Sequence, residues 1–296
     1  MLHLVRSAAT RGAWLVCAAL IFGLLPATLL AHPGSGIVVD RLGQVYFVDT
    51  GSGLWKIDTH GVLVKVTAPR FHWMTLDADD RFASARLPSG STGDVTRVGS
   101  MPTLLLASDY PLAIGSDGNL YYPSRHTGGA ALDLLRVEPR GRNSILATVS
   151  LPYLNGLAAA PDGSLYYTEN QAIRRVNSKG EVSTVVAQIA LSSCARIPGN
   201  DPNDPFLRGL AVDSSGVVFV AASGCGSVLK VTPNGQVSTV LQLEGPWSPT
   251  AVALFHGEIY VLEYLHTAVE DRLQWLPRVR RISADGKNVI IASITR

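Results

Sequence analysis

The sequence predicts an all-β fold, a six-bladed β-propeller of four-stranded antiparallel blades, from three observations. A phrase recurs as GIVVDRLGQVYFVD from Gly36, GLAAAPDGSLYYTE from Gly156 and GLAVDSSGVVFVAA from Gly209. Further along each unit a basic residue precedes a β-branched one, as in Lys56-Ile57 and Arg175-Val176. No stretch after residue 31 has a helical period. A repeat of this length made of strands alone indicates a ring of similar sheets.

Each unit is expected to contain four short strands. In the first unit these are residues 37–39, 45–48, 54–57 and 62–66. Turns at 40–43 and 58–61 end in glycine, which supplies the positive φ that such turns need. The strands are apolar throughout rather than alternating, which suits sheets that are covered on both faces by neighbouring blades.

Six units can be aligned along the chain. They begin at Gly36, Trp73, Pro111, Gly156, Gly209 and Thr250. The second unit is degenerate and reads WMTLDADDRFASA, DVTRV and TLLLA; a five-bladed ring would omit it. The first and last units each have all four strands, so we expect no strand to be exchanged between the ends of the chain.

Residues 1–31 differ in character from the rest. Arg6 and Arg11 precede an apolar run from Ala13 to Ala31, a pattern typical of a secretion signal peptide. We expect cleavage after Ala31, with residues 32–296 forming the NHL-like propeller as a secreted or periplasmic monomer that contacts no membrane. The alternative is an uncleaved membrane anchor, because the run is about as long as a minimal spanning helix.

Charge and cysteines narrow the partners and the compartment. The leader carries two of the 25 basic residues and none of the 23 acidic ones, so the remainder is formally neutral. Nothing in this balance suggests a nucleic acid partner. Cys17 lies in the leader, whereas Cys194 and Cys225 belong to the same blade and to connections that open on the same side. In an oxidising compartment they are expected to form a disulfide.

The long connections between strands are all expected on one side of the ring, which we call the top face. They cover residues 86–94, 125–134, 187–207 and 264–278. Because loops carry binding while the scaffold carries stability, the predicted site lies on the top face over the central channel, for an unknown small molecule or protein.

The repeat alignment predicts which side chains ring that site. They either precede a first strand or end a second strand. The candidate ligand-binding residues are His72, Arg86, Asn155, Glu169, Arg208, Glu263, Asp49 and Tyr110. A convergent polar set in a concave mouth favours a binding site, and we expect Glu169 and Arg208 to form an ion pair. The alternative is that these groups only cap strand ends and neutralise one another.

Local motifs assign no catalytic residue and no cofactor. The sequence contains no HExxH, GxSxG, GxxxxGK[ST] or CxxC motif. Asp77-Ala78-Asp79-Asp80 resembles the start of a calcium loop, but the acidic twelfth ligand is missing. Asp77 also aligns with Asp40 and Asp213, so we interpret it as a turn residue of the repeat.

Two known families resemble these repeats. GIVVDRLGQVYFVDTGSGLWKID resembles an NHL repeat, and NGLAAAPDGSLYYTE resembles a blade of the gluconolactonase and senescence-marker family. The second resemblance implies a six-bladed propeller with a divalent cation in the channel, held by a glutamate, asparagines and an aspartate.

Compared position by position, the family's metal ligands are mostly missing. Asn155 matches an asparagine, whereas Arg208 stands where an aspartate is expected. The expected glutamate falls among Gly34, Ser35 and Gly36, and Asp109 could replace a further asparagine. We therefore expect no metal.

Two functions remain open. The first is binding of a ligand or protein on the top face without chemistry. The second is a lactonase-like hydrolase or a lyase with a rearranged site around Asn155, Glu169, Glu263 and His72.

Overall fold

A computed structural model describes residues 33–67, 71–90, 93–98, 104–151, 154–191, 193–265 and 275–296. The chain divides into two compact units, residues 1–31 and residues 32–296. The predicted signal peptide and Cys17 lie outside the described residues. Within the described ranges, no helix has the length and hydropathy needed to cross a bilayer.

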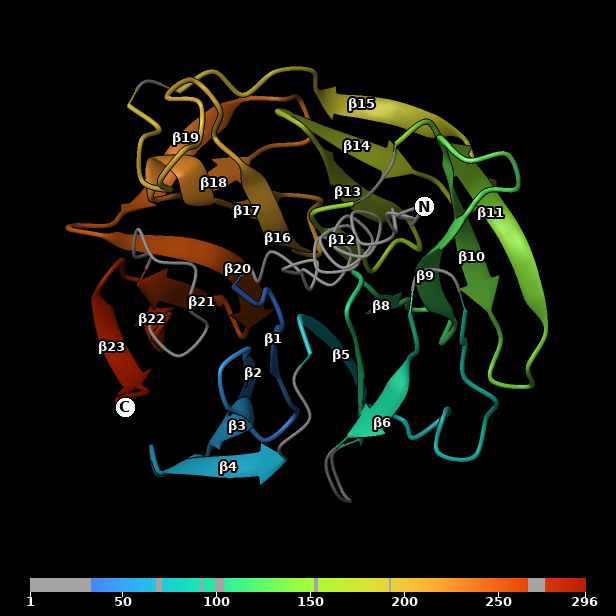
Figure 1. Ribbon diagram of the computed structural model, residues 1–296, viewed down its shortest axis with the longest axis horizontal. Helices are drawn as coiled ribbons and strands as arrows, with labels where there is room; N and C mark the ends of the chain where they lie inside the picture. Colours follow the sequence, from blue (N-terminus) through green and yellow to red (C-terminus); the bar gives the residue numbers. More distant parts are fainter. Residues whose placement is uncertain are drawn as a thin grey trace, which may run out of the picture. The chain divides into compact units, whose positions relative to one another are not determined.

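The second unit consists of six antiparallel sheets arranged around a common axis (Figure 1). Blades 1, 4, 5 and 6 keep their strands in chain order from the axis outward. Their strands are β1 (Ile37–Val39), β2 (Val45–Asp49), β3 (Gly53–Ile57) and β4 (Leu63–Thr67) in blade 1; β12 (Leu157–Ala159), β13 (Leu165–Glu169), β14 (Ala172–Val176) and β15 (Val182–Val186) in blade 4; β16 (Leu207–Val212), β17 (Val218–Ala222), β18 (Ser227–Val231) and β19 (Val237–Gln242) in blade 5; and β20 (Trp247–Phe255), β21 (Glu258–Leu265), β22 (Pro277–Ile282) and β23 (Asn288–Ser293) in blade 6.

Blade 3 has the same order. Its strands are β8 (Ala113–Ile114), β9 (Leu120–Arg125), β10 (Leu132–Val137) and β11 (Asn143–Val149). The first strands of neighbouring blades contact one another around the ring, and the last of them returns to β1. The predicted fold class and blade number are therefore confirmed.

Blade 2 departs from the expected strand order. Its described strands are β5 (Trp73–Asp77), β6 (Thr96–Val98) and β7 (Leu104–Ser108), and they lie in the order β5-β7-β6. The expected second strand, up to Arg86, is not a strand; β7 takes its place beside β5.

A buried side chain explains why the segment after β5 leaves the sheet. Phe82 is fully buried in the core between blades 2 and 3. Its backbone N–H donates to the Asp77 carboxylate at 2.6 Å, and the Arg97 guanidinium donates to its carbonyl at 2.6 Å. The chain is therefore held as a loop packed against the blade.

The glycine that begins the recurrent phrase is required by close approach of neighbouring blades. A Cβ at Gly36 would lie 2.9 Å from the Met74 nitrogen, and one at Gly209 would lie 2.7 Å from the Ala251 Cβ. At Gly156 it would collide with the Arg208 carbonyl oxygen. The repeated glycines thus let the inner strands pack side by side.

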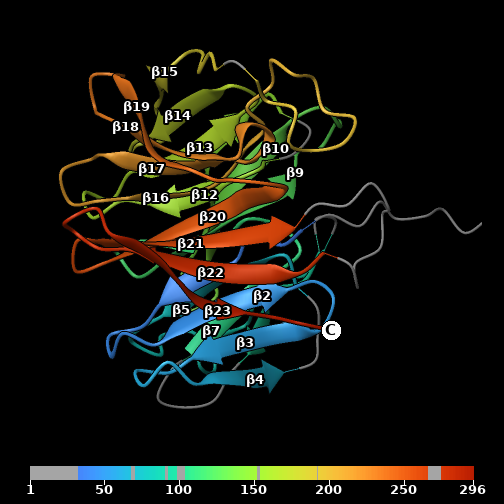
Figure 2. The same ribbon diagram turned by 90° about the vertical axis from the view of Figure 1, so that its left-hand side faces the viewer.

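The ring closes without exchange of a strand, as predicted. Blades 1 and 6 each consist of consecutive strands, and the two blades lie side by side (Figure 2). The Tyr264 hydroxyl of β21 donates to the Val48 carbonyl of β2 at 2.7 Å, and Arg296 pairs with Asp49. In the described residues, contacts made by side chains therefore join the ends, and no strand is shared between blades 1 and 6.

The predicted disulfide between Cys194 and Cys225 is present. Cys225 lies in the short 3-10 helix η1 (Ser223–Cys225), between the second and third strands of blade 5. Cys194 lies in the long connection that precedes β16. The bond ties this connection to the blade that it enters.

Candidate functional site

The strand register brings together pairs of residues on the top face. In blade 4, Leu157 lies opposite Tyr167, so Asn155 lies opposite Glu169. Blade 6 places Pro249 opposite Glu263 in the same way. Blades 4 and 6 therefore each present one such pair on the top face.

Blade 2 contributes Asp109 to this set rather than Arg86. Trp73 pairs with Ser108, so the next two residues along these strands toward the top face, His72 and Asp109, lie opposite each other. The His72 Nδ1 lies 2.9 Å from the Asp109 Oδ1. The repeat alignment did not place Asp109 beside His72, because it assigned Leu104–Ser108 to the wrong place in the sheet. Placing the apolar TLLLA run beside β5 would have found it.

Arg208 is a buried cation on the top face. It lies in β16, where a bulge separates the pairs Leu207–Ala222 and Leu210–Val220. It is 5% exposed, and its Nη2 donates to the Pro33 carbonyl at 2.6 Å. Among the described residues it forms no ion pair, and burial lowers its pKa to about 10. The predicted pair with Glu169 is wrong.

Glu169 pairs instead with Arg174 of its own blade. Glu169 pairs with Ala172 across the β13–β14 hairpin, and Arg174 lies two residues further along β14, so the contact between carboxylate and guanidinium is a diagonal one within the hairpin. They line a cavity of about 300 Å³ with Gln171 and Gln188 on the outer side of blade 4. Asn155, half-buried, makes no side-chain hydrogen bond within the described part of the chain.

The two most buried carboxylates of the predicted set are neutralised by arginines. Glu263 is fully buried and accepts from Arg278 and from the Arg280 Nε, the latter at 2.6 Å. The Arg278 guanidinium also stacks over Trp247 at 3.7 Å. Asp49, equally buried, pairs with Arg296.

One member of the predicted set lies elsewhere, and another packs against the core. Arg86 is exposed and lines a cavity of about 250 Å³ between blades 2 and 3, together with Tyr122 and Asn143. Tyr110 packs against the apolar core between the same blades. Arg86 therefore does not belong to the top-face ring, because its segment is not the second strand.

Four buried hydroxyl oxygens on the top face have no hydrogen-bond partner among the described residues. They are Ser35 Oγ, Thr50 Oγ1, Thr168 Oγ1 and Ser248 Oγ. Each lies within two residues of the start of a first strand or the end of a second strand. Buried polar groups are usually paired, so this clustering at one end of the ring is unusual.

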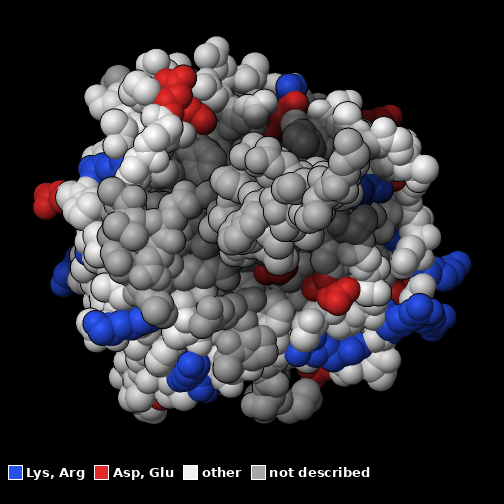
Figure 3. Space-filling view, viewed as in Figure 1, with Lys and Arg blue, Asp and Glu red and all other residues white. Residues whose placement is uncertain are grey.

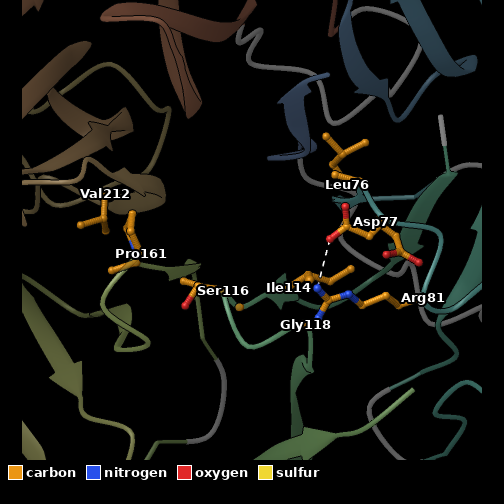
Figure 4. Close-up of a pocket in the computed structure, with 13 residues that line it drawn as sticks. Leu76, Asp77, Arg81, Ile114, Ser116, Gly118, Pro161 and Val212 are labelled. Atoms are coloured by element: carbon orange, nitrogen blue, oxygen red, sulfur yellow. Dashed lines mark hydrogen bonds and ion pairs between the residues drawn. The ribbon is translucent and has the colours of Figure 1, made fainter. Parts of the chain in front are cut away.

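A further cavity lies at the opposite end of the ring (Figure 4). It has a volume of about 380 Å³ and is lined by the ends of first strands, from Leu76, Ile114 and Val212 among others. Its charged groups already have structural partners. Asp79 binds Arg41 and Arg81, and Asp77 accepts from the backbone of Phe82.

The donor set does not fit the divalent cation that the family resemblance implies. Such a cation requires several oxygen ligands, from carboxylates, amide carbonyls and water. No group of three or more His, Cys, Asp or Glu side chains converges within the described residues. Where a carboxylate is expected beside Asn155, the buried Arg208 guanidinium stands instead.

The fold and the polar top face define a six-bladed propeller of the gluconolactonase type. A family model described as "SMP-30/Gluconolactonase/LRE-like region" matches residues 112–263, more than half of the chain. The chain belongs to this family. It is also 34% identical over 160 residues to the 6-deoxy-6-sulfogluconolactonase of Pseudomonas putida. That match spans 52% of this chain and 50% of the relative's length.

Solved structures share the fold at low sequence identity. The calcium-binding protein regucalcin from Agrobacterium tumefaciens has a TM-score of 0.55 and 16% identity, over 77% of this chain and 81% of that one. Luciferin-regenerating enzyme has a TM-score of 0.55 and 17% identity, over 85% and 91%. At this identity the similarity concerns the fold alone.

Proposed function

We propose that this protein binds a small ligand on the top face of the ring without a divalent cation, outside the cytoplasm. The observation that supports this best is Arg208, a buried cation at the position where the family resemblance expects a metal-binding aspartate. A guanidinium repels a divalent cation and favours oxygen acceptors. Asn155 and the four unpartnered hydroxyls supply further hydrogen-bonding groups.

Elemental analysis and ligand binding test this proposal together. The purified protein should contain far less than one equivalent of calcium, manganese, zinc or magnesium. A small polyhydroxylated lactone or acid should raise the unfolding temperature equally in buffer and in EDTA, because ligand binding stabilises the folded state. One full equivalent of a divalent cation, with ligand binding lost in EDTA, would overturn the proposal.

A second candidate is metal-independent lactone hydrolysis, favoured by the His72–Asp109 pair. A carboxylate beside Nδ1 fixes the orientation and the tautomer of an imidazole and leaves Nε2 as the acceptor, so the ring could serve as a general base. The named activity of the Pseudomonas putida relative points the same way. Hydrolysis of a sugar lactone in EDTA above its spontaneous rate, lost in His72→Asn, would support this candidate over binding alone.

A further inference from the structure

We propose that the ligand of the top face carries an anionic oxygen group, a carboxylate or a sulfonate, and that Arg208 receives it. This inference rests on the proposed binding function and specifies its ligand class. It also accounts for a charge that the fold itself does not balance.

The first step is the charge of Arg208. A buried guanidinium is costly unless a carboxylate or several acceptors compensate it. Here one nitrogen donates to the Pro33 carbonyl. Tyr264, which is neutral at physiological pH because burial raises its pKa, is the one titratable group of the described residues whose charge acts on Arg208. The described residues therefore provide no carboxylate to neutralise Arg208; its guanidinium carbon lies 5.9 Å from the centroid of the Phe206 ring, a cation–π contact that offsets little of the charge.

The second step is the donor count. A guanidinium offers five N–H groups in a planar fork that matches the oxygens of a carboxylate or a sulfonate. The bond to Pro33 uses Nη2. Within the described part of the chain, Nε and Nη1 donate to no other group. An anionic oxygen group can therefore bind these nitrogens while the Pro33 contact remains.

The third step is the surroundings of Arg208. Ser35 lies two residues after its partner Pro33, and a Cβ at Gly34 would lie 3.4 Å from the Thr50 Cγ2. The Ser35 and Thr50 hydroxyls are both buried and without a described partner. Hydroxyls rotate freely and can donate to an oxyanion. A buried cation and two available hydroxyl donors thus lie around one short segment of blade 1.

The other carboxylates of the top face do not compete for Arg208. Glu169, Glu263 and Asp49 are held by Arg174, by Arg278 with Arg280, and by Arg296. The basic side chains seen on the face in Figure 3 are spread along its margin. A small anion is therefore expected at Arg208 rather than a polyanion across the face.

Binding of matched probes tests the inference. We would compare D-galactonate, isethionate and the neutral D-galactono-1,4-lactone by thermal shift and calorimetry, with sodium chloride at equal ionic strength as the blank. The proteins are the wild type, Arg208→Gln and the control Arg281→Gln, whose side chain is 45% exposed. We expect saturable binding of an acid, weakened about tenfold or more in Arg208→Gln and unchanged in Arg281→Gln.

Each remaining outcome is informative. Equal shifts in all three proteins would show non-specific salt effects and overturn the inference. Binding of the lactone alone, with the same affinity in Arg208→Gln, would overturn the anion but keep the proposed function. Absence of saturable binding by all three compounds would count against both. Ser35→Ala serves as a second variant that leaves Arg208 in place; it should weaken acid binding a few-fold with an unchanged unfolding temperature in chloride.

Discussion

At the scale of single residues, the protein contains two kinds of buried charge. Glu263 and Asp49 lie fully buried but are matched by arginines. Arg208 is buried and has no counter-charge in the described part of the chain. Removing one partner of the first kind would leave a buried charge unpaired, whereas the second kind is a cost that an anionic ligand would offset.

Glu263→Gln should destabilise the protein by about 3 kcal/mol, because it leaves two largely buried arginines, Arg278 and Arg280, without their counter-charge. Urea unfolding measures the change. The same substitution at Glu138, which pairs with the exposed Arg142, should cost less than about 0.5 kcal/mol. Equal effects at the two positions would contradict this account of the buried cluster.

A second residue-scale prediction concerns pH. The Thr148 hydroxyl donates to Asp133 at 2.6 Å and, with His126, holds the pKa of that carboxyl below its usual value. Because the folded pKa is depressed, this stabilisation is present above the unfolded pKa of about 4 and is lost as the pH falls below it.

Thr148→Val should therefore lower the free energy of unfolding by about 1 kcal/mol at pH 7. The difference from the wild type should shrink as the pH falls from about 4 to 2. Unfolding midpoints measured across this range provide the test. A difference that stays constant down to pH 2 would show that the hydroxyl acts through packing alone.

At the scale of elements, blade 2 shows where sequence reasoning succeeds and where it does not. The repeat alignment predicts the strand order of five blades, three of them from the repeated phrase itself, and it predicts the disulfide from the positions of its cysteines in that repeat. In blade 2 the phrase is degenerate, and apolar content alone could not distinguish a strand from a buried loop. The burial of Phe82 decides this, and burial depends on neighbouring blades that no local pattern describes.

Phe82→Ala should destabilise the protein by about 4 kcal/mol, since it removes a fully buried aromatic ring from the core between blades 2 and 3. Arg86→Ala on the same segment is the control and should change stability by less than about 0.5 kcal/mol. Chemical denaturation distinguishes the two. If Phe82 were part of an ordinary outward-facing strand, the two variants would behave alike.

The same limit applies to the candidate site. The positions of Asn155, Glu169 and Arg208 on the top face followed from the repeat. Their partners did not, because period-2 alternation predicts the face of a residue and not which charge lies within reach. Glu169 therefore meets Arg174 across a hairpin rather than Arg208 on the next blade.

At the scale of the whole molecule, the ring depends on a seam between its first and last blades. Arg296 lies three residues beyond the end of β23 (Asn288–Ser293) and reaches Asp49 at the end of β2. Arg296→Gln should leave Asp49 buried without a counter-charge and destabilise the protein by about 2 kcal/mol. Thermal unfolding compared with Arg281→Gln, an exposed position, measures this contribution.

The seam result has a clear contrary outcome. If the variants at Arg296 and Arg281 unfold alike, closure depends on the packing of Tyr264 and its neighbours rather than on the ion pair. A Tyr264→Phe variant would then be expected to show the larger loss, since it removes the 2.7 Å hydrogen bond to Val48.

Closure without a shared strand also bears on how such a chain could be rearranged. Every blade is one continuous stretch of sequence, and the boundary between blades 6 and 1 is an interface of the same kind as the other five. Where a ring is closed by a borrowed strand, moving the chain ends to another blade cuts a sheet in two. Here the origin of the sequence is topologically arbitrary: a circular permutation that begins at any blade boundary preserves all six sheets, and whole blades are natural units for duplication or exchange.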